Sequence, residues 1–70
     1  MSIGQNIKSA RLKKDMTLEE LSRIIGVSRQ TLSRYETGVI PNIPPDRVRA
    51  LAEALGVTSD YLHGLDILKG

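Results

Sequence analysis

The stretch from residue 17 to residue 35 contains two short apolar stripes separated by one glycine, and this spacing restricts the fold more than any other feature of the sequence. Each stripe repeats its apolar residues every three or four positions, as one face of an α-helix does: Leu18, Leu21 and Ile25, then Leu32 and Tyr35. Gly26 accepts the left-handed backbone that ends a helix, and Ser28 is a preferred N-cap for the next helix. The sequence therefore predicts two helices joined by a tight turn.

Start and stop residues divide the rest of the 70-residue chain into three further short helices. Capping boxes, in which Ser or Thr precedes Gln or Glu by three positions, mark two helix starts: Ser2 with Gln5, and Thr17 with Glu20. Further starts are expected at Pro45 and at Thr58 or Ser59, and stops near Asp15 and at Gly38, Gly56 and Gly64. Two prolines make residues 39–44 a loop. We predict an all-α fold, a compact five-helix bundle in one domain over residues 1–70.

The composition excludes several classes of protein. Without cysteine, the chain has no disulfide and no thiolate to hold zinc. No apolar run approaches the roughly 18–20 residues of a membrane span, and the N-terminus alternates apolar and polar residues, unlike a secretory signal. We therefore expect a cytoplasmic protein. His63 is the only histidine, so no metal site and no cofactor are expected.

The charge is unevenly distributed along the chain, although its net value is only +2. Residues 1–34 carry seven basic and three acidic side chains, whereas residues 35–70 carry three basic and five acidic ones. Such an asymmetry orients one face toward a polyanion. The alternative is a set of solvated helix faces, and charge alone does not decide between the two.

The paired helices meet the particular requirements of a helix-turn-helix over residues 17–36. Their steep crossing needs a small residue in the first helix, a turn glycine and an apolar anchor in the second: Ser22, Gly26 and Leu32. An ordinary αα-hairpin needs only the apolar stripe. The second helix also exposes residues that read DNA: Arg29, Gln30, Ser33, Arg34 and Thr37. Arg forms two hydrogen bonds with guanine and Gln two with adenine, so we favour DNA binding.

The segment TLEELSRIIGVSRQTLSRYETG resembles the helix-turn-helix of Cro and CI-type phage repressors and their bacterial relatives. The following VIPNIPPDRVRALAEALGVTSDYLHGLD is similar to the same domain of prophage CI-type repressors, and with IGQNIKSARLKK the resemblance covers nearly the whole chain. It implies a lambda-repressor-like domain that binds double-stranded operator DNA as a homodimer and represses transcription.

The resemblance also assigns roles to individual residues. It implies base-reading positions at Arg29, Gln30, Ser33 and Arg34, and phosphate-contacting positions at Thr17, Leu18, Ser28, Thr37, Gly38 and Asn42. It pairs Arg11 with Glu36 in a structural ion pair whose remaining Arg11 N–H groups contact a phosphate. Two residues depart from the family pattern. Leu18 replaces a phosphate-binding Gln, which leaves only its backbone N–H, and Asp15 replaces a turn glycine.

Other readings remain open beside the repressor. The apolar C-terminal residues form either a dimer seam or a cap on the core: Tyr61, Leu62, Leu65 and Ile67. Tyr35 is expected in the core rather than stacked on a base. A protein-interaction module, such as an antitoxin-like partner with this fold, is the alternative function. An enzyme with a small-molecule substrate is not expected, because the sequence shows no nucleophile–base pair and no Gly-rich phosphate loop.

Overall fold

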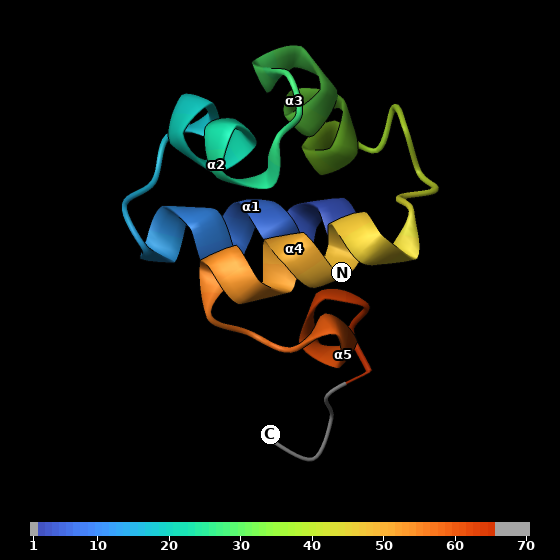
Figure 1. The fold of residues 1–70 in the computed structure, drawn as a ribbon. Coiled ribbons are helices and arrows are strands. Elements are labelled where there is room, and N and C mark those ends of the chain that lie inside the picture. The colour runs from blue at the N-terminus through green and yellow to red at the C-terminus, as the bar shows by residue number, and fades with distance from the viewer. Residues whose placement is uncertain (1, 66–70) are drawn as a thin grey trace.

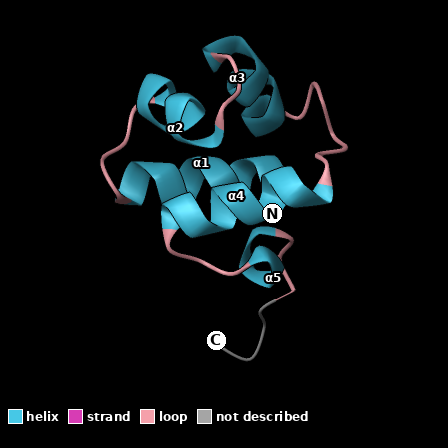
Figure 2. Ribbon diagram, in the orientation of Figure 1, coloured by secondary structure: helices cyan, strands magenta, loops and turns pink. Residues whose placement is uncertain are grey.

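The computed structural model describes residues 2–65, and within this range the chain consists of helices, turns and loops without a strand (Figures 1 and 2). The helices are α1 (Ile3–Lys13), α2 (Leu18–Ile25), α3 (Arg29–Thr37), α4 (Pro45–Leu55) and α5 (Ser59–Leu62). In Figure 1, α2 and α3 lie on one side of the α1–α4 layer and α5 lies on the other. The predicted all-α, five-helix fold is confirmed.

Helices α1 and α2 begin directly after the predicted N-cap residues, Ser2 and Thr17. Both capping boxes are complete: the side chain of Ser2 accepts the Gln5 N–H at 3.2 Å, and that of Thr17 accepts the Glu20 N–H at 3.0 Å. In turn, the side-chain oxygens of Gln5 and Glu20 accept the backbone N–H groups of Ser2 and Thr17. Thr58, rather than Ser59, caps α5. Local side-chain chemistry therefore fixes where these helices begin.

The turn after α1 has the left-handed conformation expected where the family has glycine. Helix α1 ends at Lys13, Lys14 is its C-cap, and Asp15 follows with φ of 56°. Among the described residues it is the only non-glycine with positive φ. Asp tolerates this conformation better than most residues, so the turn to α2 is made at some cost in strain.

Every helix contributes one completely buried aliphatic residue to the core: Ile7, Leu21, Leu32, Leu51 and Leu62. Burying a side chain of this size stabilises a fold by about 1.5–3 kcal/mol. Tyr35 is 4% exposed and lies in the same core cluster, as predicted. Its hydroxyl accepts a 3.1 Å hydrogen bond from Arg47 Nη1, which joins α3 to α4.

Helix α1 contacts α5 on one side and α3 on the other. Asn6 Nδ2 donates a buried 2.9 Å bond to the carbonyl of Leu62 and so anchors α5. On the other side, α1 packs so tightly on α3 that a Cβ on Gly4 would overlap the backbone carbonyls of Tyr35 and Glu36. Sequence reasoning assigned no role to Gly4. Its lack of a side chain is what lets α3 approach α1.

Candidate nucleic-acid interface

The tight turn between α2 and α3 sets the position of α3. Ser22, on α2, is 4% exposed, and its Oγ donates to the carbonyl of Glu19 at 2.9 Å. Gly26 ends α2 with φ of 77°, and the N–H groups of Gly26 and Val27 both bond to the carbonyl of Ser22 at 2.9 and 3.0 Å. A small crossing residue and a left-handed glycine are what a helix-turn-helix requires.

Helix α3 divides into a buried face and an exposed face. Leu32, Tyr35 and Glu36 are buried, whereas the predicted base-reading residues Arg29, Gln30 and Arg34 are exposed and Ser33 is half-buried. Ser28 caps the helix by accepting the Thr31 N–H at 3.0 Å, and its hydroxyl donates to Thr31 Oγ1 at 2.9 Å. The exposed face therefore carries two guanidinium groups and an amide but no carboxylate.

A buried ion pair links α1 to α3. Arg11 Nε donates to Glu36 Oε2 at 2.8 Å, and Nη2 donates to Oε1 at 3.1 Å. Arg11 Nη1 donates to the carbonyl of Met16 at 2.8 Å, in the turn before α2. The two charged side chains are only 8% and 5% exposed. One guanidinium thus connects α1, the α1–α2 turn and α3.

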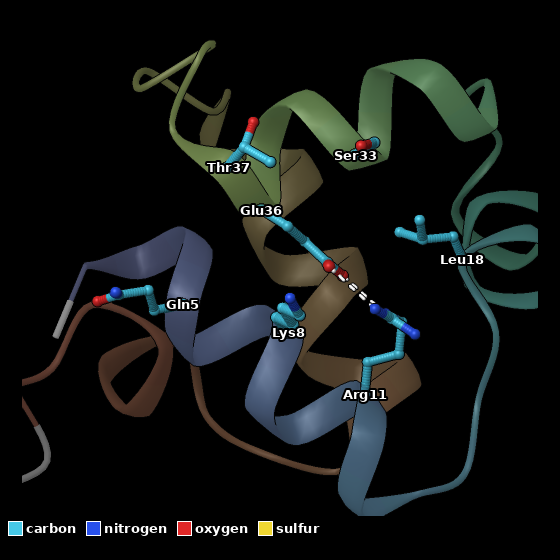
Figure 3. A pocket seen from close by; sticks show the side chains of 7 residues that line it. All are labelled: Gln5, Lys8, Arg11, Leu18, Ser33, Glu36 and Thr37. Carbon is cyan, nitrogen blue, oxygen red and sulfur yellow. Dashed lines mark hydrogen bonds and ion pairs between the residues drawn. The ribbon is translucent and has the colours of Figure 1, made fainter.

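A hollow of about 440 Å³ opens between α1, α2 and α3 (Figure 3). It brings together four of the residues predicted to contact DNA, namely Arg11, Leu18, Ser33 and Thr37. The other predicted residues do not line it: Thr17, Ser28, Arg29, Gln30, Arg34, Gly38 and Asn42. All of these are exposed, so they lie on the protein surface outside the hollow.

Two residues of the hollow were not predicted. Gln5 and Lys8 line it from α1, and Glu36 reaches it from α3 (Figure 3). Their signal was present in the sequence, because positions 5, 8 and 11 follow one another at helical spacing and therefore lie on one face of α1. Their importance depends on which helices pack beside that face, which the spacing does not reveal.

Hydrogen bonding perturbs two ionisable groups near these elements. The hydrogen bond from the backbone N–H of Thr17 holds the pKa of the Glu20 carboxyl below its ordinary value, and the Thr17 side chain adds to this effect. The hydrogen bond to Tyr35 raises the pKa of Arg47. Both groups therefore keep their charge at neutral pH. Among residues 2–65, no three His, Cys, Asp or Glu side chains gather where they could hold a metal ion.

The structure divides the C-terminal apolar residues between the core and the surface. Leu62 is fully buried and Tyr61 packs partly buried against the core, so these two cap the bundle. Leu65 is 65% exposed, and Ile67 lies outside the described residues. Of the two alternatives, the cap on the core is therefore the one that holds for Leu62. None of the described helices is both long and apolar enough to cross a membrane.

Comparison with known proteins agrees with this geometry. The family model described as helix-turn-helix matches residues 7–62. An HTH-type transcriptional regulator of Rickettsia prowazekii is 41% identical over 65 residues, which are 91% of this chain and 49% of that protein. A transcriptional regulator in the ATPase CF(0) region of Rhodospirillum rubrum is 35% identical over 68 residues, covering 97% of this chain and 61% of that protein.

A third relative carries a different description. The antitoxin PezA of Streptococcus pneumoniae is 58% identical over 36 residues, which are 51% of this chain and 23% of the antitoxin. The chain thus spans between about a quarter and three fifths of the length of these three relatives. Because the family match includes all of α2 and α3 with the turn between them, the chain belongs to the helix-turn-helix family of DNA-binding domains.

Proposed function

We propose that the chain binds double-stranded operator DNA sequence-specifically and regulates transcription as a repressor of the phage or prophage type. Helix α3 enters the major groove, and its base-reading residues are Arg29, Gln30, Ser33 and Arg34. The observation that carries this proposal is the exposed face of α3, which displays two arginines and a glutamine while its one acid, Glu36, is buried and paired. Arginine and glutamine match the acceptor and donor patterns of guanine and adenine.

Phosphate contacts on either side of α3 fix its register on the duplex. They come from the helix N-termini at Thr17, Leu18 and Ser28, and from Arg11. Further contacts come from Thr37 at the end of α3 and from Gly38 and Asn42 after it. The first N–H groups of a helix lack partners within that helix and attract anions. Leu18 offers only its backbone N–H. Such contacts position the protein without reading sequence.

Two copies bind one operator in this proposal. Helix-turn-helix dimers read two half-sites about 34 Å apart, related by a two-fold axis. Leu65, which is 65% exposed and follows α5, is available for contacts between the copies. Helix α5 itself lies on the side of α1 away from α3 (Figure 1). A single module buries about 600–1,000 Å² of protein surface on DNA, so a second copy on the same operator doubles the contact area.

Selection from a randomised duplex pool tests the proposal. The wild-type chain should enrich a two-fold symmetric site, and Arg29→Ala should relax the preference at one base pair in each half-site by about 1–3 kcal/mol. Arg49→Ala is the matched control, because Arg49 is an exposed arginine of α4 and not of α3. It should leave the selected sequence unchanged. If both variants select the same site as wild type, or if no sequence is enriched even when two copies of the chain are joined, this function is wrong as proposed.

A protein-interaction module, such as an antitoxin-like partner, is the second candidate, and the likeness to an antitoxin over 36 residues favours it. It predicts weak binding to every duplex even when two copies are joined. Fusing the chain to a parallel coiled coil supplies a dimer without altering α3. Enrichment of a sequence only in the fused form supports the repressor, whereas no enrichment in either form supports the interaction module.

A further inference from the structure

The hollow between α1, α2 and α3 is large enough to admit a phosphate group and offers hydrogen-bond donors to it, but Leu18 stands where the family resemblance implies a glutamine. Leu18 lines it from the first position of α2. Its side chain offers no hydrogen bond and no charge. Opposite Leu18, Gln5 and Lys8 reach the same hollow from α1 (Figure 3). Helix α1 thus supplies polar side chains to the hollow where α2 supplies none, and Ser33 and Thr37 add hydroxyl groups from α3.

The charge of the hollow is carried by one side chain. Arg11 and Glu36 neutralise each other through two hydrogen bonds, at 2.8 and 3.1 Å. Helix α1 contains no acidic residue, and among residues 2–65 the pair of Arg11 with Glu36 is the only ion pair. The ammonium of Lys8 therefore has no acidic partner there. The net positive charge of the hollow belongs to Lys8.

The buried guanidinium still has donors to offer. A guanidinium carries five N–H groups, and three of its nitrogens each donate one bond within the protein, two to Glu36 and one to the carbonyl of Met16. Two N–H groups remain on an arginine that lines the hollow. They can orient a phosphate oxygen, but their charge is already balanced by Glu36.

We infer that Lys8 holds one DNA backbone phosphate in this hollow and supplies the attraction that Leu18 cannot provide. This inference rests on the proposed function and names a phosphate-binding residue that the resemblance did not supply. Arg11 and the backbone N–H of Leu18 orient the phosphate, and Lys8 supplies the charge. Gln5, one turn before Lys8 on the same face, lies within the same hollow as a neutral donor.

The salt dependence of DNA binding tests this assignment. Each neutralised phosphate contributes close to −0.9 to the slope of log K against log salt concentration on B-DNA. Binding of the selected duplex is measured for wild type, Lys8→Gln and Lys13→Gln. Lys13 is the matched control, because it is exposed on the same helix but does not line the hollow. Equal melting temperatures of the three proteins would show that folding is unchanged.

The expected result is a slope less steep by about 0.9 for Lys8→Gln than for Lys13→Gln. The affinity lost in Lys8→Gln then shrinks about 3.5-fold when salt rises from about 50 to 200 mM. Equal slopes for the two variants would overturn the role of Lys8 while leaving the proposed function intact. Failure of the wild type to bind any duplex at low salt would overturn the proposed function itself.

A second pair of variants tests whether Lys8 and residue 18 serve the same phosphate. Leu18→Gln adds the missing hydrogen-bonding side chain. It should raise affinity more in the Lys8→Gln background than in wild type, because in wild type the phosphate is already held, and it should leave the reduced salt slope of Lys8→Gln unchanged. Equal gains in the two backgrounds would mean that the two positions act independently, and the inference would be wrong.

Discussion

The guanidinium of Arg11 and the carboxylate of Glu36 join α1 to α3 through two nearly buried hydrogen bonds, at 2.8 and 3.1 Å. The third bond of Arg11, to the carbonyl of Met16, extends this link to the turn before α2. Removing one partner leaves the other charge buried without compensation. The orientation of α3 on the bundle therefore depends on both charges being present.

Arg11→Ala and Glu36→Ala should each destabilise the fold by roughly 3–5 kcal/mol, because each leaves one buried charge unpaired. A domain of this size has about 0.05–0.15 kcal/mol of stability per residue, so either variant loses about a third of it or more. Urea unfolding at low temperature measures the losses. The double variant should lose less than the two single losses together. Losses that simply add would show that the pair is not coupled.

Gly4→Ala should destabilise the protein by roughly 1–3 kcal/mol, the usual cost of forcing an extra group into a packed contact. The new Cβ would lie 2.6 Å from the Glu36 carbonyl oxygen and closer still to that of Tyr35. Elsewhere in a helix the same change stabilises by about 0.5–1 kcal/mol, so the sign is diagnostic. Lys13→Ala, at an exposed position of α1, is the control and should change Tm little. A higher Tm for Gly4→Ala would contradict the close approach.

Local features of the fold were predictable because they depend on neighbouring residues alone. Ser2 and Thr17 cap helices through side chains three positions away, and Gly26 ends one through its own backbone freedom. The apolar periodicity likewise placed Leu21, Leu32 and Tyr35 in the core. By contrast, the residues of the buried pair lie 25 positions apart, and their pairing was expected only from the family resemblance.

Features that arise from packing between helices were not predicted. Nothing in the residues around Gly4 shows that α3 will press on it, because that contact depends on the crossing of two separate helices. Lys8 was assigned to no site for the same reason. On the sequence it is one of several lysines, and only the arrangement of α1, α2 and α3 places it in the hollow while Lys13 lies outside. The roles of the base-reading residues stay predictions.

Asp15→Gly should stabilise the protein, since Asp15 holds φ of 56°. A left-handed L-residue costs about 1–2 kcal/mol, and the greater unfolded-state freedom of glycine offsets about 0.5–1 kcal/mol of the gain. A net gain near 1 kcal/mol raises Tm by about 4–8 °C in a domain of this size. Asp15→Asn removes the charge but keeps the tolerance for this conformation, so it separates strain from electrostatics. A Gly variant that melts at or below the wild-type temperature would show that no strain is relieved.

The capping box at α2 should give the protein an acid-sensitive contribution to its stability. In the folded protein the pKa of Glu20 lies below its ordinary value of 4.5, chiefly because its carboxylate accepts the Thr17 backbone N–H. A carboxyl whose pKa is lowered by folding stabilises the fold above the unfolded value, and this contribution is lost as pH falls through the lower, folded value. Glu20→Gln keeps an acceptor for the cap but does not titrate. Relative to this variant, wild type should therefore be more stable at pH 7 than at pH 3, measured as the difference in urea midpoint at each pH. A difference that stays constant between these two pH values would show that the charge of Glu20 does not support the start of α2.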